Sequence, residues 1–393
     1  MSWKEVSVVV RRLEFVKLAL KAQQSMSQLC RVFGFSRKRG YKWKVRFERE
    51  GSGGLRDRAR RPQGSPWRMA PEWLARIGRL RRRHRSWGSQ KLGARLRKIY
   101  PRQAVPCART IGKWLKLMKW NRRGRRRSRG GPPLKPRGLT IARRSNQVWT
   151  VDFKGWFRTQ DGRRVEPLTV RDMFSRYLLS ARLLEVQNWQ QVRRVFMRLF
   201  RQYGYPTVIR MDNGVPFGSS GPAGLSRLSA WWTALGIRVE FIAPGHPEQN
   251  GAHEQMHRVF KAETTRPASC HLRAQQRRTD RWARIYNRIR PHEALGQRPP
   301  AEVYCPKPGR VRRVALSYPS RWAVRRVRSN GQIKWRGRKR FVGEAFVGYP
   351  IGLKQLSEEK RAVYFADVLI GEVWKSDAGG MRPARYVRRS WKR

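Results

Sequence analysis

A stretch without acidic side chains, residues 121–145, divides this chain and limits what it can fold into. Its first 24 residues, NRRGRRRSRGGPPLKPRGLTIARR, contain ten Lys and Arg. Like charges at this density repel one another, and the interspersed Gly and Pro break regular elements, so no packed core is expected. The stretch is therefore predicted to be a basic linker, disordered or ordered by DNA, with Arg125, Arg126 and Arg127 as DNA contacts.

The charge of the whole chain points to the kind of partner. Across 393 residues, 91 Lys and Arg face 25 Asp and Glu, a net charge of +66. A compact state with this charge repels itself unless a polyanion offsets it, and nucleic acid gains affinity from each phosphate that is neutralised. Charge predicts the partner but not the activity, because a purely architectural DNA-binding protein needs it too.

The remaining bulk features predict an intracellular protein without a membrane partner. No apolar run approaches the roughly 20 residues that span a bilayer, and no secretory signal is recognisable. The four cysteines are far apart and form no C-x-x-C pair, which argues against a zinc ribbon or a disulfide framework.

Residues 1–60 are predicted to form a helix-turn-helix DNA-binding domain. Gly34 permits the turn, Ser36 can cap the second helix, and Tyr41, Val45 and Phe47 are expected to point inward. A basic second helix is typical of one that enters the major groove, although an ordinary helical hairpin with a solvated basic face has the same pattern. The candidate DNA contacts on this helix are Arg37, Lys38, Arg39, Lys42 and Lys44.

A second helical, helix-turn-helix-like domain is expected over residues 66–120, after a Gly- and Arg-rich joint at 50–66. Its predicted core residues are Leu74, Ile77, Leu80, Leu92, Leu96 and Ile99. The segment PCARTIGKWLKLM is expected to form its last helix.

From residue 146 to 305 the pattern indicates a mixed α/β core. QVWTVDFKGWF, VEPLTVRDMF and RYLLSARLLEV are strand-like runs with short breaks, followed by a helix that Asn188 can cap with Gln191 three residues later. The runs PTVIRM and RVEFIA predict two further strands, each followed by a helix. The predicted order is βββαβαβα, with five strands in one mixed sheet.

The C-terminal region, residues 310–393, is predicted to be a small β-barrel that contacts DNA or protein. Asn330-Gly331 is the favoured dipeptide of a type I′ hairpin, and AVYFADVLIGEVW predicts a further strand pair.

Most acidic residues of this chain are expected to be scattered ion-pair partners of the many arginines, but three acids are not. Asp152 lies on the first strand of the core, Asp212 ends the fourth, and Glu254 lies early in the helix after the fifth. In this order of elements the first and fourth strands are neighbours, so the three carboxylates can converge. Clustered carboxylates need a cation, and hard oxygen ligands suit Mg²⁺ or Mn²⁺. Two such ions about 3.5–4 Å apart perform phosphodiester chemistry.

These residues and their flanking sequences resemble insertion-sequence transposases and retroviral integrases, whose catalytic core carries two aspartates and a glutamate. The matching stretches are NQVWTVDF, RMDNGVPF, PGHPEQNGAHEQMHRVFKAE and YNRIRPHEALGQRPPAEVY. The resemblance implies an RNase H-like core in which Asp152, Asp212 and Glu254 bind two metal ions and catalyse the reaction, while Lys261 contacts DNA phosphate. It also implies a bacterial, cytoplasmic, nucleoid-associated protein that cuts the ends of a mobile element and joins them to target DNA, as a homo-oligomer assembled on double-stranded DNA.

Two alternatives concern the same helix. Glu248 could be the third acid, but it precedes Asn250-Gly251 and is expected to lie before the helix. His253-Glu254-Gln255-Met256-His257 also matches the H-E-x-x-H pattern of zinc peptidases, but the downstream third ligand of that class is missing. His253 and His257 are therefore predicted to lie on the helix surface or to face DNA, with Met256 in the core.

Overall fold

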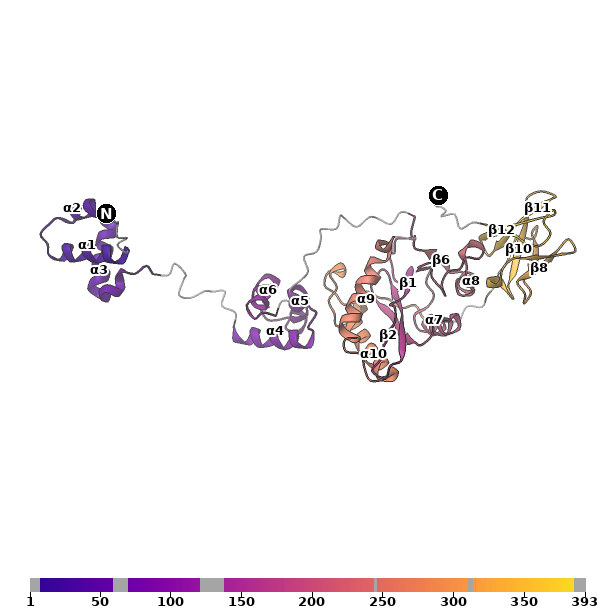
Figure 1. The fold of residues 1–393 in the computed structure, drawn as a ribbon, viewed down its shortest axis with the longest axis horizontal. Helices are drawn as coiled ribbons and strands as arrows, with labels where there is room; N and C mark the ends of the chain where they lie inside the picture. Colours follow the sequence, from indigo (N-terminus) through magenta and orange to yellow (C-terminus); the bar gives the residue numbers. More distant parts are fainter. Residues whose placement is uncertain are drawn as a thin grey trace. The chain divides into compact units, whose positions relative to one another are not determined.

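The computed structural model describes residues 8–58, 70–120, 138–243, 246–309, 314 and 316–384. The chain separates into two compact units at Ala70. The first is helical, and the second contains a further group of helices, a mixed α/β core and a C-terminal group of strands (Figure 1).

The N-terminal unit contains α1 (Val8–Leu20), α2 (Met26–Phe33), α3 (Arg37–Glu50) and the short 3₁₀ helix η1 (Gly51–Leu55). Ser36 caps α3 by accepting a hydrogen bond from the backbone N–H of Arg39. Gly34 ends α2 with a left-handed φ of 69°, which permits the tight turn between the two helices. The predicted helix, turn and basic helix are confirmed. Leu55 is fully buried, so the packed unit extends into the segment expected to be a joint.

The inward face of α3 differs from the prediction. Tyr41 and Val45 are 51% and 43% exposed, whereas Trp43 is buried. Gly40 explains why a different face of α3 is buried. A Cβ at this position would lie 2.7 Å from the Cys30 sulfur, so α3 packs closely against α1 and α2 there. The expectation that Tyr41 and Val45 point inward is wrong, because the small Gly40 and the large Trp43 together define the buried face.

Three helices follow in the second unit: α4 (Pro71–Arg83), α5 (Ser89–Ile99) and α6 (Ala108–Leu117). Ile77, Leu92 and Leu96 are buried as predicted, but Ile99 is 42% exposed and does not belong to the core. The predicted core also omitted Trp87, which is buried and stacks on the ring of His84.

Residues 138–144, at the end of the predicted basic linker, are attached to the α/β core. The backbone N–H of Thr140 donates to the carboxylate of Glu240 at 3.2 Å, and its carbonyl accepts from the buried Arg210 side chain. Arg210 and Glu240 also form an ion pair. Residues 121–137 lie outside the described residues.

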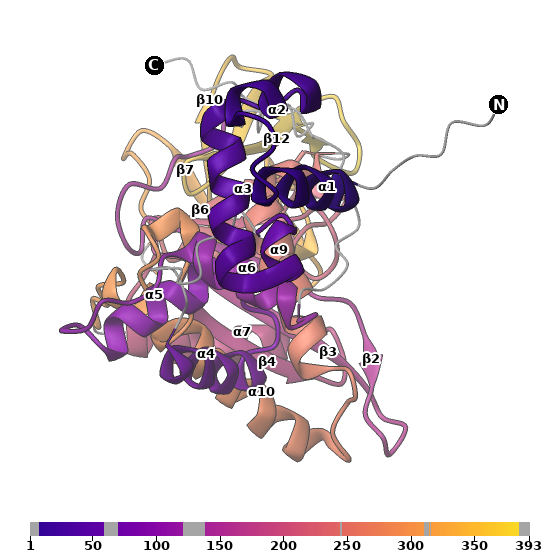
Figure 2. The same ribbon diagram turned by 90° about the vertical axis from the view of Figure 1, so that its left-hand side faces the viewer.

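The α/β core is built on a six-stranded mixed sheet. Its order is β4-β3-β1-β5-β6, with the short β2 paired to the start of β3. β1 runs parallel to β5, which runs parallel to β6, and β3 is antiparallel to β1, β2 and β4. The β2–β3 hairpin reaches away from the rest of the sheet (Figure 2). The strands are β1 (Val148–Phe153), β2 (Phe157–Arg158), β3 (Arg164–Asp172), β4 (Leu178–Leu184), β5 (Val208–Met211) and β6 (Arg238–Phe241).

Helices cover both faces of this sheet (Figure 1). The helices are α7 (Trp189–Tyr203), α8 (Arg227–Ala234), α9 (Gly251–Thr264) and α10 (Leu272–Arg288). Trp149 and Val151 of β1 point into the core shared with α7 and α8, whereas the alternating Thr150 and Asp152 face α9. The predicted pattern of strands and helices is confirmed, and β2 and α10 are additions to it.

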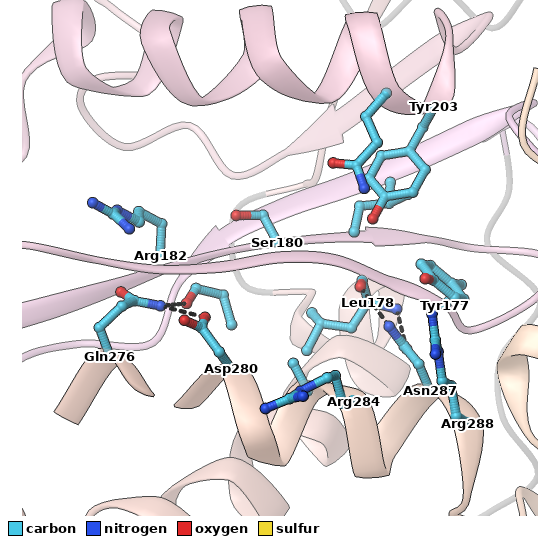
Figure 3. A pocket seen from close by; sticks show the side chains of 14 residues that line it. Tyr177, Leu178, Ser180, Arg182, Tyr203, Gln276, Asp280, Arg284, Asn287 and Arg288 are labelled. Atoms are coloured by element: carbon cyan, nitrogen blue, oxygen red, sulfur yellow. Dashed lines mark hydrogen bonds between the residues drawn. The ribbon is translucent and has the colours of Figure 1, made fainter. Parts of the chain in front are cut away.

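Helix α10 covers the outer edge of β4. The side-chain amide of Asn287 accepts from the N–H and donates to the C=O of Leu178. The amide of Gln276 in the same way accepts from Leu183 N–H and donates to the Ala181 carbonyl (Figure 3). Two helix side chains thus take the place of a neighbouring strand along this edge.

The C-terminal region packs against the α/β core through α8 and the 3₁₀ helices η2 (Pro222–Gly224) and η6 (Glu344–Phe346). It consists of a five-stranded sheet in the order β13-β12-β11-β10-β7 and a two-stranded sheet, β8-β9. The strands are β7 (Ala323–Arg326), β8 (Gln332–Trp335), β9 (Arg338–Phe341), β10 (Pro350–Gln355), β11 (Lys360–Phe365), β12 (Val368–Trp374) and β13 (Arg382–Pro383).

The hairpin predicted around Asn330-Gly331 does not form. β7 pairs with β10 and β8 pairs with β9, so the two flanking strands belong to different sheets. Gly331 has a φ of 75°, but Asn330 is not in the left-handed region that a type I′ turn requires. The predicted pair formed by β11 and β12 is confirmed.

We predict that Phe196→Ala lowers the free energy of unfolding of the core by about 3–5 kcal/mol, because Phe196 is fully buried on α7 against Trp232, at 4.7 Å between ring centroids. Val186→Ala, at a 58% exposed position, should change it by less than about 0.5 kcal/mol. Urea denaturation followed by tryptophan fluorescence measures both values. Equal effects of the two substitutions would contradict the packing described here.

Candidate active site

The site begins with two aspartates on neighbouring parallel strands. β1 and β5 pair in a register in which Val148, Trp149 and Thr150 lie opposite Val208, Ile209 and Arg210. Continued by two residues, the same offset places Asp212 beside Asp152, on the same face of the sheet. Asp212 directly follows the end of β5, and its carboxylate accepts from the backbone N–H of Gly214 at 3.3 Å.

Helix α9 brings the third acid to the same end of the sheet. Glu254 lies in its first turn. Just before the helix, the Asn250 side-chain nitrogen lies 3.5 Å from Asp152 Oδ2, and His257 Nδ1 approaches the same oxygen to 3.7 Å. Glu254 itself is exposed.

The three acids interact electrostatically. The pKa of Asp152 is raised to about 7, mainly by burial and also by the negative charges of Asp212 and Glu254. Lost hydration raises the pKa of Asp212 as well, although the residue remains exposed at the end of its strand. Mutually repelling carboxyl groups at one end of a sheet form a site that a cation would stabilise.

The two histidines of α9 are buried, which overturns the expectation that they lie on the helix surface or face DNA. His253 is fully buried between strands β1 and β3: its Nδ1 lies 2.8 Å from the Thr150 hydroxyl and its Nε2 lies 2.7 Å from the Thr169 hydroxyl. His257 Nε2 lies 2.7 Å from the same Thr169 hydroxyl. Burial lowers the pKa of His257 to about 3 and that of His253 well below its usual value. Met256 is buried in an apolar cluster with Leu178 and Phe260, so its predicted place in the core is confirmed.

Among the described residues, Asp152, His253 and His257 form a group whose ligand atoms all lie within 4.8 Å of one another. Asp212 and Glu254 are not in that group, so the three predicted acids do not all lie within this distance of one another. The histidines belong to the site through Asp152, not as a peptidase pair flanking Glu254.

The predicted DNA contacts are placed as follows. Arg37, Lys38, Arg39 and Lys42 are exposed on α3, whereas Lys44 is half-buried and lies 4.0 Å from Glu48. Lys261 is exposed on α9, seven residues after Glu254. Arg125, Arg126 and Arg127 lie outside the described residues.

A cavity of about 340 Å³ lies away from the carboxylates, between β4, α7 and α10 (Figure 3). Arg182, Arg284 and Arg288 line it together with Asp280 and Tyr203. Because β3 separates β4 from β1 in the sheet, this cavity is distinct from the acid site.

Family models match four parts of the chain. Two models described as integrase core domain match residues 142–247 and 235–300. A helix-turn-helix domain model matches residues 11–63, and a model of the C-terminal domain of IS481 family transposases matches residues 322–373. The matches thus run in the order of a helix-turn-helix domain, an integrase core domain and the C-terminal domain of IS481 family transposases.

Similar proteins come from bacterial insertion elements. The chain is 31% identical to an uncharacterized 31.7 kDa protein of insertion element IS407 from Burkholderia multivorans, over 45% of this chain and 62% of that protein. It is 29% identical to a 39.2 kDa protein of IS476 from Xanthomonas euvesicatoria, over 58% of this chain and 63% of that protein. The chain thus spans less than two thirds of these relatives. The resemblance to insertion-sequence transposases with an integrase-like core is confirmed.

Solved structures with detectable similarity include the HTLV-2 integrase catalytic core domain in complex with magnesium, at 14% identity and a TM-score of 0.34 over 42% of this chain and all of that one. A simian T-cell lymphotropic virus intasome in complex with a PP2A regulatory subunit gives 14% identity and a TM-score of 0.36, over 69% of this chain and 91% of that one. Both scores are too low to define the fold. Across the described residues, no helix is long and apolar enough to cross a membrane.

We predict that Asp152→Asn stabilises the protein at pH 8 but not at pH 4. The pKa of Asp152 is raised from about 3.8 to about 7 in the folded state, so the folded chain binds this proton more tightly than the unfolded chain. Its contribution to stability is present at low pH and is lost as the pH rises through 7, a difference on the order of a few kcal/mol. Urea denaturation with chelator present, at pH 4, 6 and 8, measures it.

Asp161→Asn provides a control of opposite sign. A hydrogen bond from the Thr159 hydroxyl lowers the pKa of the exposed Asp161, so this substitution should cost stability at neutral pH and above, not increase it. Parallel pH profiles for the wild type and Asp152→Asn would contradict the assignment.

Proposed function

We propose that this chain is a DNA transposase that cuts the ends of a mobile element and joins the exposed 3′-hydroxyl to target DNA, both steps depending on a divalent metal. The observation that carries the proposal is the β1–β5 register, which sets Asp152 beside Asp212 at the end of the sheet where α9 presents Glu254. In this proposal the three acids are catalytic: Asp152 would bind both metal ions, and Asp212 and Glu254 would each bind one of them.

The donor atoms fit magnesium or manganese. They are carboxylate oxygens at a site where like charge raises the pKa of Asp152. The side-chain oxygen of Asn250, beside Asp152, is buried without a hydrogen-bond partner. Oxygen-rich sites with accessible positions suit Mg²⁺ and Mn²⁺. When bound, these ions supply charge neutralisation and Lewis acidity at a phosphodiester.

Other residues of the chain position the acids. The Thr169 hydroxyl donates to the backbone carbonyl of Asp152 at 3.0 Å, which helps to fix this part of β1. Lys154, two residues further on, is close enough to lower the pKa of Asp152 and could also receive a phosphate. Lys261 lies two helical turns after Glu254, and we assign it a contact with DNA phosphate.

The other domains would bind DNA. Lys38, Tyr41, Lys42, Val45 and Arg49 recur at helical spacing and line one side of α3. A face that combines charge for phosphates with aromatic and apolar groups suits a recognition helix in the major groove. Joining two element ends requires at least two protomers, so we propose a homo-oligomer assembled on double-stranded DNA in the bacterial cytoplasm, at the nucleoid.

Two finer points of architecture belong to the same proposal. The strand order β4-β3-β1-β5-β6, with three antiparallel strands followed by two parallel ones, supports an RNase H-like core. The two C-terminal sheets, which share one core with α8, support a small barrel that contacts DNA backbone or protein.

We predict that Asp152→Asn and Glu254→Gln each reduce strand cleavage by at least about 10³-fold while DNA affinity changes less than threefold, because only metal-assisted chemistry depends on these groups. Glu248→Gln, which alters the alternative third acid, should retain cleavage. The assay uses Mn²⁺ and a duplex with the ends of the element that encodes this chain. Binding without cleavage by the wild type would favour a purely architectural or inactive DNA-binding protein.

We also predict that replacing both Lys38 and Lys42 with Ala weakens binding to duplex DNA. The slope of log affinity against log salt should fall in magnitude by about 1.8, since each lost phosphate contact removes about 0.9. Lys375→Ala is a matched control, because Lys375 is already paired with Glu359 at 3.1 Å. Fluorescence anisotropy across a salt series measures the slope, and an unchanged slope in the double variant would exclude α3 as a phosphate-binding helix.

A further inference from the structure

One ring nitrogen of His257 faces the carboxylate of Asp152. Its Nε2 contacts the Thr169 hydroxyl at 2.7 Å, and its Nδ1 faces Asp152 Oδ2 at 3.7 Å. The side chain is 6% exposed. His253, one turn earlier, differs because threonine hydroxyls occupy both of its ring nitrogens.

The hydroxyl of Thr169 determines which nitrogen of His257 carries the proton. A hydroxyl has one hydrogen to donate and two lone pairs that accept. Thr169 donates to the backbone carbonyl of Asp152 at 3.0 Å, so it accepts from the Nε2–H groups of both His253 and His257. The Nδ1 atom of a neutral His257 then carries a lone pair, directed at the Asp152 carboxylate.

Two lone-pair atoms that face each other in a buried site are unfavourable unless a positive species lies between them. Asn250 approaches the same oxygen of Asp152 only at 3.5 Å. A cation satisfies both lone pairs at once.

We infer that His257 Nδ1 is a nitrogen ligand of the divalent ion held by Asp152, so that the site has mixed nitrogen and oxygen ligands. Two atoms that each lie about 2.1 Å from one small ion can be up to about 4.2 Å apart, and the observed 3.7 Å is within that limit. A histidine that binds metal through one nitrogen usually donates a hydrogen bond through the other, as His257 does to Thr169. The inference rests on the proposed function only in that Asp152 binds a metal.

The nitrogen ligand would change which metal the site prefers. Imidazole favours Mn²⁺ and later transition metals over Mg²⁺, which prefers an all-oxygen environment. Loss of His257 should therefore weaken Mn²⁺ binding about tenfold or more and Mg²⁺ binding less than about threefold.

Pulsed EPR of Mn²⁺ bound to the full-length protein tests this directly, because it detects nitrogen nuclei coupled to the ion. The wild type should show an imidazole nitrogen, and selective ¹⁵N labelling of histidine should convert the ¹⁴N signal to ¹⁵N. His257→Asn should lose the signal. His271→Asn is the matched control: His271 is an exposed N-cap of α10, and Asn preserves the cap. Circular dichroism checks that each variant is folded, and the labelling experiment needs no variant.

The outcomes separate this inference from the function on which it rests. If Mn²⁺ binds in an Asp152-dependent manner but shows no histidine nitrogen, or if the signal persists in His257→Asn, the ligand assignment is overturned and the carboxylate site stands. If Asp152→Asn leaves Mn²⁺ binding unchanged, the proposed metal site fails and this inference fails with it. A histidine signal lost only in His257→Asn supports the assignment.

Discussion

The parallel pairing of β1 with β5 is the contact on which the acid site depends. Asp152 and Asp212 are separated by 60 positions (212 − 152), and only the strand register brings them side by side. Their mutual repulsion opposes this arrangement. It is held in place by the backbone hydrogen bonds of the sheet and by Trp149 and Ile209, which are buried on the opposite face. Apolar packing on the opposite face of the sheet thus holds the two mutually repelling carboxylates side by side.

The two faces of the central sheet differ in chemistry for the same reason. The face toward α7 and α8 is apolar, whereas the face beneath α9 carries Thr150 and Thr169, which bond to the buried histidines. An apolar residue in place of His253 would remove one hydrogen-bond partner from each of these two hydroxyls, while Thr169 would keep its contacts with His257 and the Asp152 carbonyl. Helix α9 is therefore attached to the sheet by hydrogen bonds, which are directional. Their geometry sets the position of the first turn of α9 and so of Glu254.

The sequence predicted the elements of the core well because their periodicity is strong: Phe196 and Leu199 share the buried face of α7, and Asn188 caps it as expected. It failed where polar residues are buried or small residues set the packing. Helix α10 was not predicted because the polar residues Gln275 and Thr279 occupy buried positions. They interrupt the apolar periodicity by which an amphipathic helix is recognised in a sequence. The position of Asp212 beside Asp152 followed from the predicted strand order. The burial of the histidines could not be predicted, because their hydroxyl partners come from strands that are distant in the sequence.

The edge of β4 has a consequence for how copies of this chain can meet. An open strand edge is a template on which another chain can add a strand. At Leu178, Ala181 and Leu183 the amides of Asn287 and Gln276 already occupy the backbone groups that an incoming strand would need. Continuous β-structure cannot spread from one molecule to the next at these positions, so copies of this chain are protected there from fibre-like association.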